Sequence, residues 1–277
     1  MMDRLFDLSG VRVRLRGLDD ALGERFDERW GAYAVAEDDA EVDLDVVVVA
    51  LDAEMENVEF GANWTRSGSV TGIRRFGMHE GAIEIDGKRS RAEIRRGDAG
   101  RRFGGLANLV CAALATTLPS RGAAVLHGAG VVIDDIGFVL VGPEGSGKST
   151  WLALATEAGG RPLSDDLVVV DAAGEALTVL QSPFRDETAA RSAPGRWPVG
   201  AILFPAHGRP ARLDDVATLE ARARLLANLP FVSEDLASDG RLATLVDTVL
   251  RGTPVHTLTF DREPSFVALL RRRFTGR

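Results

Sequence analysis

Residues 137–159, GFVLVGPEGSGKSTWLALATEAG, decide the fold of this chain. Within them, Gly142-Pro-Glu-Gly-Ser-Gly-Lys148-Ser149 matches the pattern G-x-x-x-x-G-K-[ST] of a phosphate-binding P-loop. A short valine-rich run precedes the glycines, as in a buried strand, and the segment after Lys148 is typical of a helix that ends at Gly159-Gly160. Strand, loop and helix in this order are the context that the motif requires, so the sequence predicts an α/β fold that binds a nucleoside triphosphate.

The loop chemistry depends on backbone N–H groups. Glycines let successive N–H groups turn inward around a β-phosphate, which the N-terminus of the following helix also attracts. Lys148 is expected to reach the β- and γ-phosphates, and the Ser149 hydroxyl to ligate Mg²⁺. The residues expected to bind the nucleotide are Gly142, Pro143, Glu144, Gly145, Ser146, Gly147, Lys148, Ser149 and Thr150. The alternative is a strand-turn-helix whose glycines only make the bend, but average residue frequencies produce this pattern by chance in roughly one such chain in a hundred.

Acidic residues downstream of the loop are candidates for metal binding and proton transfer. A helix of about 11 residues carries the chain roughly 16 Å from the phosphates, and an extended return over 161–165 covers a similar distance. Asp165 and Asp166 therefore come back level with the loop, whereas Asp171 overshoots it by roughly 16 Å. One carboxylate of the pair can hold metal or water while the other accepts a proton. The alternative is that Ser164-Asp165-Asp166 only marks a turn.

His127 ends the apolar run AAVLH and precedes Gly-Ala-Gly. A lone histidine here is more often a satisfied strand-end residue than a catalytic one. A strand next to the P-loop strand would deliver it to the phosphate edge, where it could pair with an aspartate or touch phosphate.

The segment 126–171, LHGAGVVIDDIGFVLVGPEGSGKSTWLALATEAGGRPLSDDLVVVD, resembles the core of the HPr kinase/phosphorylase family, whose fold is related to phosphoenolpyruvate carboxykinase. The family has a His-Gly motif, a loop ending in Gly-Lys-Ser and an Asp-Asp pair, and the spacings from His127 to Lys148 and on to Asp166 agree with its pattern. The resemblance implies that Asp166 is the proton acceptor in phosphorylation, that Lys148 and His127 are catalytic, and that Ser149 helps bind Mg²⁺. Together with Asp165 as a second catalytic and metal-binding residue, these are the predicted site residues, with ATP and Mg²⁺ as cofactors.

The resemblance covers about one sixth of the chain and does not extend to the family's later Glu-x-Arg-Gly signature. In its place, residues 182–198 are expected to form a long loop with Arg185, Arg191 and Arg196, which could clamp a γ-phosphate or lie in solvent. The sequence thus predicts the phosphate site but not the phosphate acceptor, which could be a serine of a protein or peptide, or a small molecule. Whether phosphorylase activity exists, and whether the chain forms a homo-oligomer, is left open.

Three functions compete for this motif set. The first is an ATP-dependent kinase that transfers the γ-phosphate to a hydroxyl, with Asp166 as the base. The second is a nucleotide-dependent switch or accessory protein that moves no phosphate, since the same residues bind Mg-ATP either way. The third is a mechanical ATPase of the transporter type, which would need a Leu-Ser-Gly-Gly signature that this sequence lacks.

The rest of the chain suggests two domains, a β-rich module at 1–100 and the P-loop α/β domain at 101–277. Strands are expected in the first at 11–16, 43–52, 58–60, 70–76 and 82–86. A connecting helix is expected at 104–118. In the second domain, strands are expected at 123–127, 130–134, 137–142, 166–171, 177–181, 199–204 and 255–260, and helices at 148–158, 214–228, 234–250 and the C-terminus.

Composition restricts the class of protein. With 277 residues, 45% of them hydrophobic and 27% charged, the chain can bury a core. The formal net charge of -8 argues against a general nucleic-acid partner. Cys111, the one cysteine, is expected on the buried face of a helix. The first residues lack a signal-peptide pattern and no stretch approaches the roughly 20 apolar residues of a membrane span, so a cytoplasmic protein without a membrane partner is expected.

Overall fold

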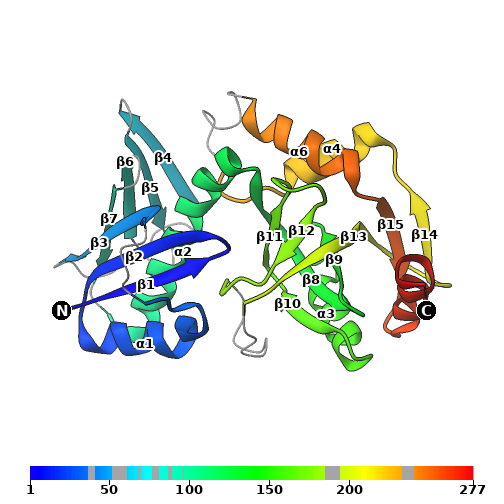
Figure 1. The fold of residues 1–277 in the computed structure, drawn as a ribbon, viewed down its shortest axis with the longest axis horizontal. Helices are drawn as coiled ribbons and strands as arrows, with labels where there is room; N and C mark the ends of the chain where they lie inside the picture. The colour runs from blue at the N-terminus through cyan, green and yellow to red at the C-terminus, as the bar shows by residue number, and fades with distance from the viewer. Residues whose placement is uncertain are drawn as a thin grey trace. The chain divides into compact units, whose positions relative to one another are not determined.

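The protein has a mixed α/β fold in two compact units, Met1–Thr116 and Thr117–Arg277 (Figure 1). The computed structural model describes residues 1–36, 41–51, 61–67, 70–76, 81–86, 89–95, 97–184, 194–232 and 240–276. The units divide near the end of helix α2 (Ala99–Thr117). The boundary expected after residue 100 would cut this helix at its start, because the sequence pattern alone does not say which unit a connecting helix packs into.

In its described residues, the first unit is a seven-stranded sheet with two helices. Its elements are β1 (Met2–Leu8), β2 (Val11–Leu18), α1 (Asp20–Trp30), a 3-10 turn (Gly31–Tyr33), β3 (Leu44–Leu51), β4 (Gly61–Ser67), β5 (Val70–Phe76), β6 (Gly81–Asp86), β7 (Arg89–Arg95) and α2. The strand order is β1-β2-β3-β7-β6-β5-β4, with β3 parallel to both neighbours and the other pairs antiparallel. The strands expected at 11–16, 43–52, 70–76 and 82–86 are present, and 58–60 lies outside the described residues.

Helix α1 was not expected from the sequence. Asp19 caps it by accepting a hydrogen bond from the Leu22 N–H at 3.0 Å. The helix buries Phe26 and Trp30, which pack edge to face with a ring centroid distance of 4.9 Å. Phe103 of α2 joins them, 4.8 Å from Phe26. The core of this unit therefore depends on aromatic contacts between α1 and α2 that no local pattern reveals.

Helix α2 is a long apolar helix. With the 3-10 turn that follows, Ala99–Arg121 is long and apolar enough to cross a membrane by length and composition alone, contrary to the expectation that no stretch comes close to that limit. In the structure 61% of its apolar window is buried inside the protein, as in a core helix. Cys111 lies on its buried side, as expected.

The second unit contains the glycine loop. Its elements are a 3-10 turn (Leu118–Arg121), β8 (Ala123–Ile133), β9 (Ile136–Val141), α3 (Lys148–Glu157), β10 (Arg161–Ser164), β11 (Leu167–Asp171), β12 (Thr178–Leu180), β13 (Arg196–His207), β14 (Arg212–Asp215), α4 (Thr218–Ala227), α6 (Arg241–Gly252), β15 (Val255–Phe260), α7 (Ser265–Leu270) and a π-helical turn (Arg271–Thr275). Three expectations need correction: 123–127 and 130–134 are one strand, residues 212–215 form strand β14 rather than the start of a helix, and β13 begins within the expected loop.

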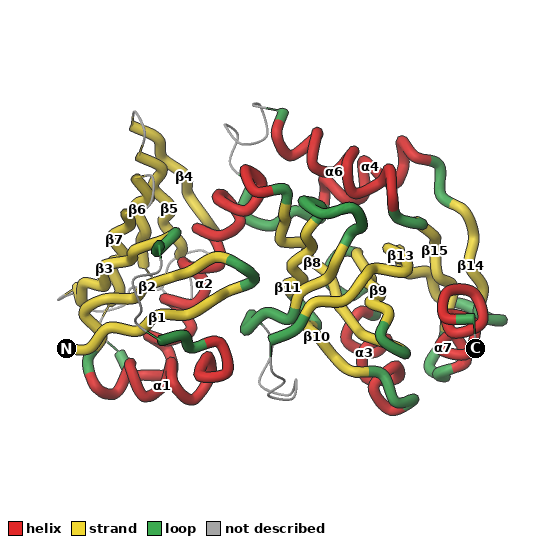
Figure 2. Tube along the Cα trace, in the orientation of Figure 1, coloured by secondary structure: helices red, strands yellow, loops and turns green. Residues whose placement is uncertain are grey.

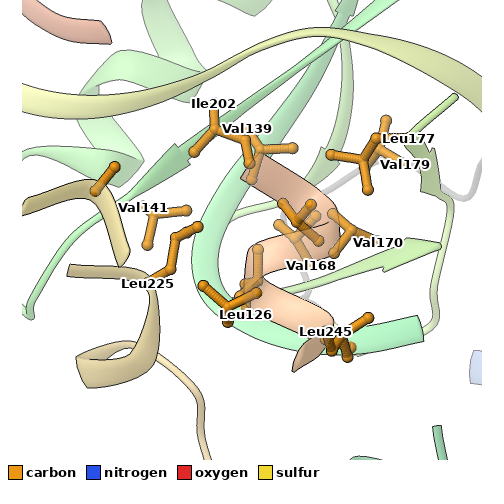
Figure 3. Packing of buried hydrophobic residues seen from close by; sticks show 14 of the residues in the cluster. Leu126, Val139, Val141, Val168, Val170, Leu177, Val179, Ile202, Leu225 and Leu245 are labelled. Carbon is orange, nitrogen blue, oxygen red and sulfur yellow. The ribbon is translucent and has the colours of Figure 1, made fainter. Parts of the chain in front are cut away.

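Helices cover both faces of the second-unit sheet (Figure 2). Helices α4 and α6 pack on one face, where Leu225 and Leu245 belong to the same buried cluster as Leu126 and Val141 (Figure 3). Helices α3 and α7 pack on the other, where Trp151 and Phe266 stack at 6.0 Å. The valine-rich strands are buried on both sides, which explains why they are apolar throughout rather than alternating.

Strand β8 changes partners halfway along its length. Its first half pairs with β11, with His127 opposite Leu167, and its second half pairs with β9 and β10, with Gly128 opposite Val141 of β9. A Cβ on Gly128 would lie 2.9 Å from the Leu140 carbonyl oxygen, so glycine allows the two strands to approach at the changeover. The consequence is that the start of β11 and the end of β9 meet at adjacent residues of one strand.

Candidate functional site

The glycine loop connects β9 to α3, as the sequence predicted. Gly145 and Gly147 adopt left-handed conformations, with φ of 74° and 93°, which side chains other than glycine rarely adopt. A Cβ on Gly142 would lie 2.8 Å from Ser146 Oγ and 2.9 Å from a ring carbon of Pro205. These glycines therefore let the loop fold tightly against the end of β13.

The loop has features that fit a phosphate chain. Helix α3 begins at Lys148 without a side-chain cap at Gly147, so the first N–H groups of the helix face outward without an intrahelical acceptor. Ser149 and Thr150 are exposed in this first turn. Ser146 Oγ is buried and has no hydrogen-bond partner among the described residues. Free N–H groups and an unpaired hydroxyl at a helix N-terminus are the groups that bind phosphate oxygens.

Lys148 points back toward the end of strand β9 and is only 7% exposed. Its Nζ donates to the carbonyl oxygens of Gly142 at 2.8 Å and Pro143 at 2.9 Å, and lies 2.9 Å from Nε2 of His127. Burial lowers the pKa of Lys148 below its usual value, while the charges of Asp166 and Glu144 act in the opposite direction. The ammonium group is thus held in place and partly desolvated at the mouth of the loop.

His127 and Asp166 complete a line of charged and polar groups with Lys148. Nδ1 of His127 lies 3.1 Å from Oδ1 of Asp166, whose side chain is 60% exposed. When Nδ1 carries the proton and donates to this carboxylate, Nε2 is free to accept a hydrogen bond from Lys148. The sequence-predicted residues Lys148, His127 and Asp166 are therefore brought together, with the carboxylate at the solvent-facing end of the line.

Backbone pairing positions Asp166. The Gly128 N–H donates to the Asp166 carbonyl at 2.9 Å, directly after the pair His127 and Leu167. Ser164 Oγ accepts the N–H of Leu167 at 3.2 Å and of Asp166 at 3.3 Å, and donates to the Phe184 carbonyl at 3.0 Å. The Ser-Asp-Asp segment is thus a turn and also the segment that carries Asp166 to His127, so the two readings of the sequence do not exclude each other.

The residues expected to bind Mg²⁺, Ser149 and Asp165, are respectively exposed and half-buried. Within the described residues, no group of three or more His, Cys, Asp and Glu side chains could hold a metal ion alone. This fits the way Mg²⁺ is usually bound in nucleotide sites, through one or two protein oxygens together with phosphate oxygens and water. The two residues fit that pattern only when a phosphate completes the coordination.

Asp171 and Arg196, both considered in the sequence, lie away from this line. Asp171 is at the far end of β11, opposite Ala123, and forms an ion pair with Arg196 at 2.7 Å. Arg196 therefore pairs within the sheet, while Arg185 and Arg191 fall outside the described residues. Trp151, fully buried against Phe266, is a packing residue and is not available to stack on a base.

Sequence reasoning missed two residues of this region. Ser164 was considered only as a turn marker, but it is buried and holds the turn before β11. His207 was assigned no function, yet it lies against Gly147, since a Cβ on that glycine would be 3.0 Å from its Cε1. The position of Ser164 three residues before Leu167 was a local signal, whereas nothing in the sequence links His207 to a loop sixty residues earlier.

Comparisons with known proteins give little beyond the geometry. No protein-family model matches the chain, and no curated protein matches it. Among solved structures, it is similar to the Hpr(Ser) kinase/phosphatase from Coxiella burnetii, at 13% sequence identity and a TM-score of 0.30 over 53% of this chain and 93% of that chain. A likeness at that TM-score does not establish a function for this chain, so its function has to be inferred from its own residues.

Proposed function

We propose that this protein is an ATP-dependent kinase that transfers the γ-phosphoryl group to a hydroxyl. The observation that carries the proposal is the continuous line from Lys148 through His127 to Asp166 beside a glycine loop that fits phosphate. A structural turn needs glycines, but it does not need a buried lysine in contact with a histidine-carboxylate pair. Those groups suit phosphoryl transfer, which depends mainly on positioning and charge stabilisation.

Each side chain has a role that its position supports. Asp166, at the exposed end of the line, accepts the proton of the acceptor hydroxyl as its oxygen forms a bond to the γ-phosphorus. The bond from that phosphorus to the β,γ-bridging oxygen breaks, and ADP leaves. Lys148 neutralises charge on the phosphates, and His127 orients the Asp166 carboxylate through Nδ1.

Mg²⁺ would supply further charge neutralisation and hold the β- and γ-phosphates in one geometry. Ser149 and Asp165 are the protein residues proposed to hold it, because they flank the loop on α3 and on the turn before β11. The order of His127, Lys148 and Asp166 along the chain supports a domain of the HPr kinase type. The acceptor remains a serine of a protein or peptide, or a small molecule, and a cytoplasmic location remains part of the proposal.

Transfer of label from γ-labelled ATP to components of a fractionated cell extract tests the function. Asp166→Asn should lower the transfer rate by about 10²- to 10⁴-fold, the usual contribution of a general base, with Mg-ATP affinity nearly unchanged. Asp171→Asn is the matched control, since it removes a carboxylate at the far end of β11, which directly follows Asp166, and outside the line. A wild-type rate for Asp166→Asn would overturn the mechanism, and tight Mg-ATP binding without any labelled product would favour a nucleotide-dependent switch.

A further inference from the structure

His207 lies on the side of the glycine loop opposite the line formed by Lys148, His127 and Asp166. It is the last residue of β13, which runs parallel to β9 and pairs with it up to Leu203 and Leu140. His127 belongs to β8, which pairs with the other edge of β9. The strand that leads into the loop is thus flanked by His127 on one side and by the strand carrying His207 on the other.

The His207 side chain touches the loop itself. Its Cε1 would lie 3.0 Å and its Nε2 3.8 Å from a Cβ on Gly147, the residue that precedes helix α3. The imidazole is exposed, and the ring of buried Phe260 lies next to it, tilted by 50° at a ring centroid distance of 5.9 Å. An exposed aromatic ring that packs against a buried phenylalanine and lies at the end of the glycine loop suits the stacking of a base.

The segment that carries His207 is held in place by the neighbouring strand. The Gly208 N–H donates to the Phe260 carbonyl at 3.0 Å. Arg209 forms ion pairs with Asp261 and with Glu263, the latter at 2.9 Å. These contacts join the carboxyl ends of β13 and β15, so the backbone that carries His207 is held in place beside the glycine loop.

The residues on the two sides of the loop indicate how a bound nucleotide would be oriented. If the γ-phosphate lies at Lys148 and Asp166, as the proposed function requires, the nucleoside must leave the loop away from them. The side of β9 away from β8 is that of β13, where His207 contacts Gly147. Resting on the proposed function, we infer that His207 is a binding residue for the nucleoside end of the triphosphate, with its imidazole ring stacking on the base.

Binding of two ligands tests this inference, because inorganic tripolyphosphate has the phosphates of ATP but no nucleoside. His207→Ala should weaken Mg-ATP binding about tenfold, as expected for the loss of one base-aromatic stack, and leave Mg-tripolyphosphate affinity within about twofold. Arg212→Ala, on exposed strand β14 with its own ion pair to Asp214, is the control and should change neither affinity. Equal weakening of both ligands, or no change in either, would overturn the assignment.

A measurement on the wild-type protein covers the case in which His207→Ala does not fold. The ring protons of His207 should shift in the NMR spectrum when Mg-ATP binds, from the ring current of the base, and should shift much less with Mg-tripolyphosphate. Equal shifts with both ligands would contradict base stacking. The outcome is separate from the kinase test, because loss of transfer in Asp166→Asn does not depend on His207, and ATP selectivity over tripolyphosphate does not depend on transfer.

Discussion

The two ends of strand β11 carry similar carboxylates in different surroundings. At the start, Asp166 lies 3.1 Å from His127 and through it contacts Lys148. At the end, Asp171 pairs with the half-exposed guanidinium of Arg196. The two carboxylates stand at opposite ends of the same apolar run, but only Asp166 lies close to the glycine loop.

Strand pairing explains the difference. Strands β8 and β11 are antiparallel, so moving from Asp166 to Asp171 runs from His127 back toward Ala123, away from the changeover at Gly128. Because each residue of a strand advances the chain by about 3.3 Å, the second carboxylate is carried well away from the glycine loop. The register of one strand, more than the type of residue, therefore decides which acid lies beside His127.

The largest contrast expected in nucleotide affinity is between Lys148 and Arg196. Lys148→Met should weaken Mg-ATP binding by about 10- to 100-fold, the usual worth of a hydrogen bond between charged groups. Arg196→Met removes a cation from the other end of the same sheet and should leave the affinity unchanged. Calorimetric titration of both variants checks this, with circular dichroism to verify folding. Similar losses in both would mean that net charge, and not the loop, attracts the nucleotide.

A smaller contrast concerns stability at two glycines. Gly128→Ala should lower the free energy of unfolding by about 1–3 kcal/mol, because the new Cβ meets the Leu140 carbonyl at 2.9 Å in a packed interior. Gly174→Ala, in the turn after Asp171, meets nothing closer than 3.9 Å and should be neutral or slightly stabilising. Urea unfolding measures both. A neutral Gly128→Ala would show that the strands can separate at the changeover without cost.

The smallest effect is a pH dependence of stability from Lys148. Because burial lowers its pKa in the folded protein below the ordinary 10.5, the unfolded chain binds more protons between the two values. The free energy of unfolding contributed by this group therefore rises as pH increases through that window, and is lowest below it. The difference in unfolding free energy between wild type and Lys148→Met, measured at several pH values, should increase toward alkaline pH. A constant difference would mean that the pKa is not lowered by folding.

Local sequence patterns predicted much of the second unit and less of the first. Strand β9, the glycine loop and helix α3 were predicted because their sequence contains its own local signals. These are a valine run, glycines that can adopt left-handed conformations, and helix-forming residues. Helix α1 and strand β1 were missed, because polar residues interrupt their apolar patterns and the partners that bury them lie elsewhere in the chain. The helix expected from 214 was wrong at its start because pairing with β15 makes residues 212–215 a strand.

For the candidate site, the sequence by itself determined the residue types and their spacing: the glycine loop with Lys148, a histidine upstream and a pair of acids downstream. Only the tertiary structure decided that Lys148, His127 and Asp166 meet, because β8 changes partners at Gly128 and joins the ends of two other strands. It also decided that His207 lies beside Gly147. Spacing along the chain reflects local geometry, whereas contacts across a sheet depend on strand order and register, which are set by burial of the whole core.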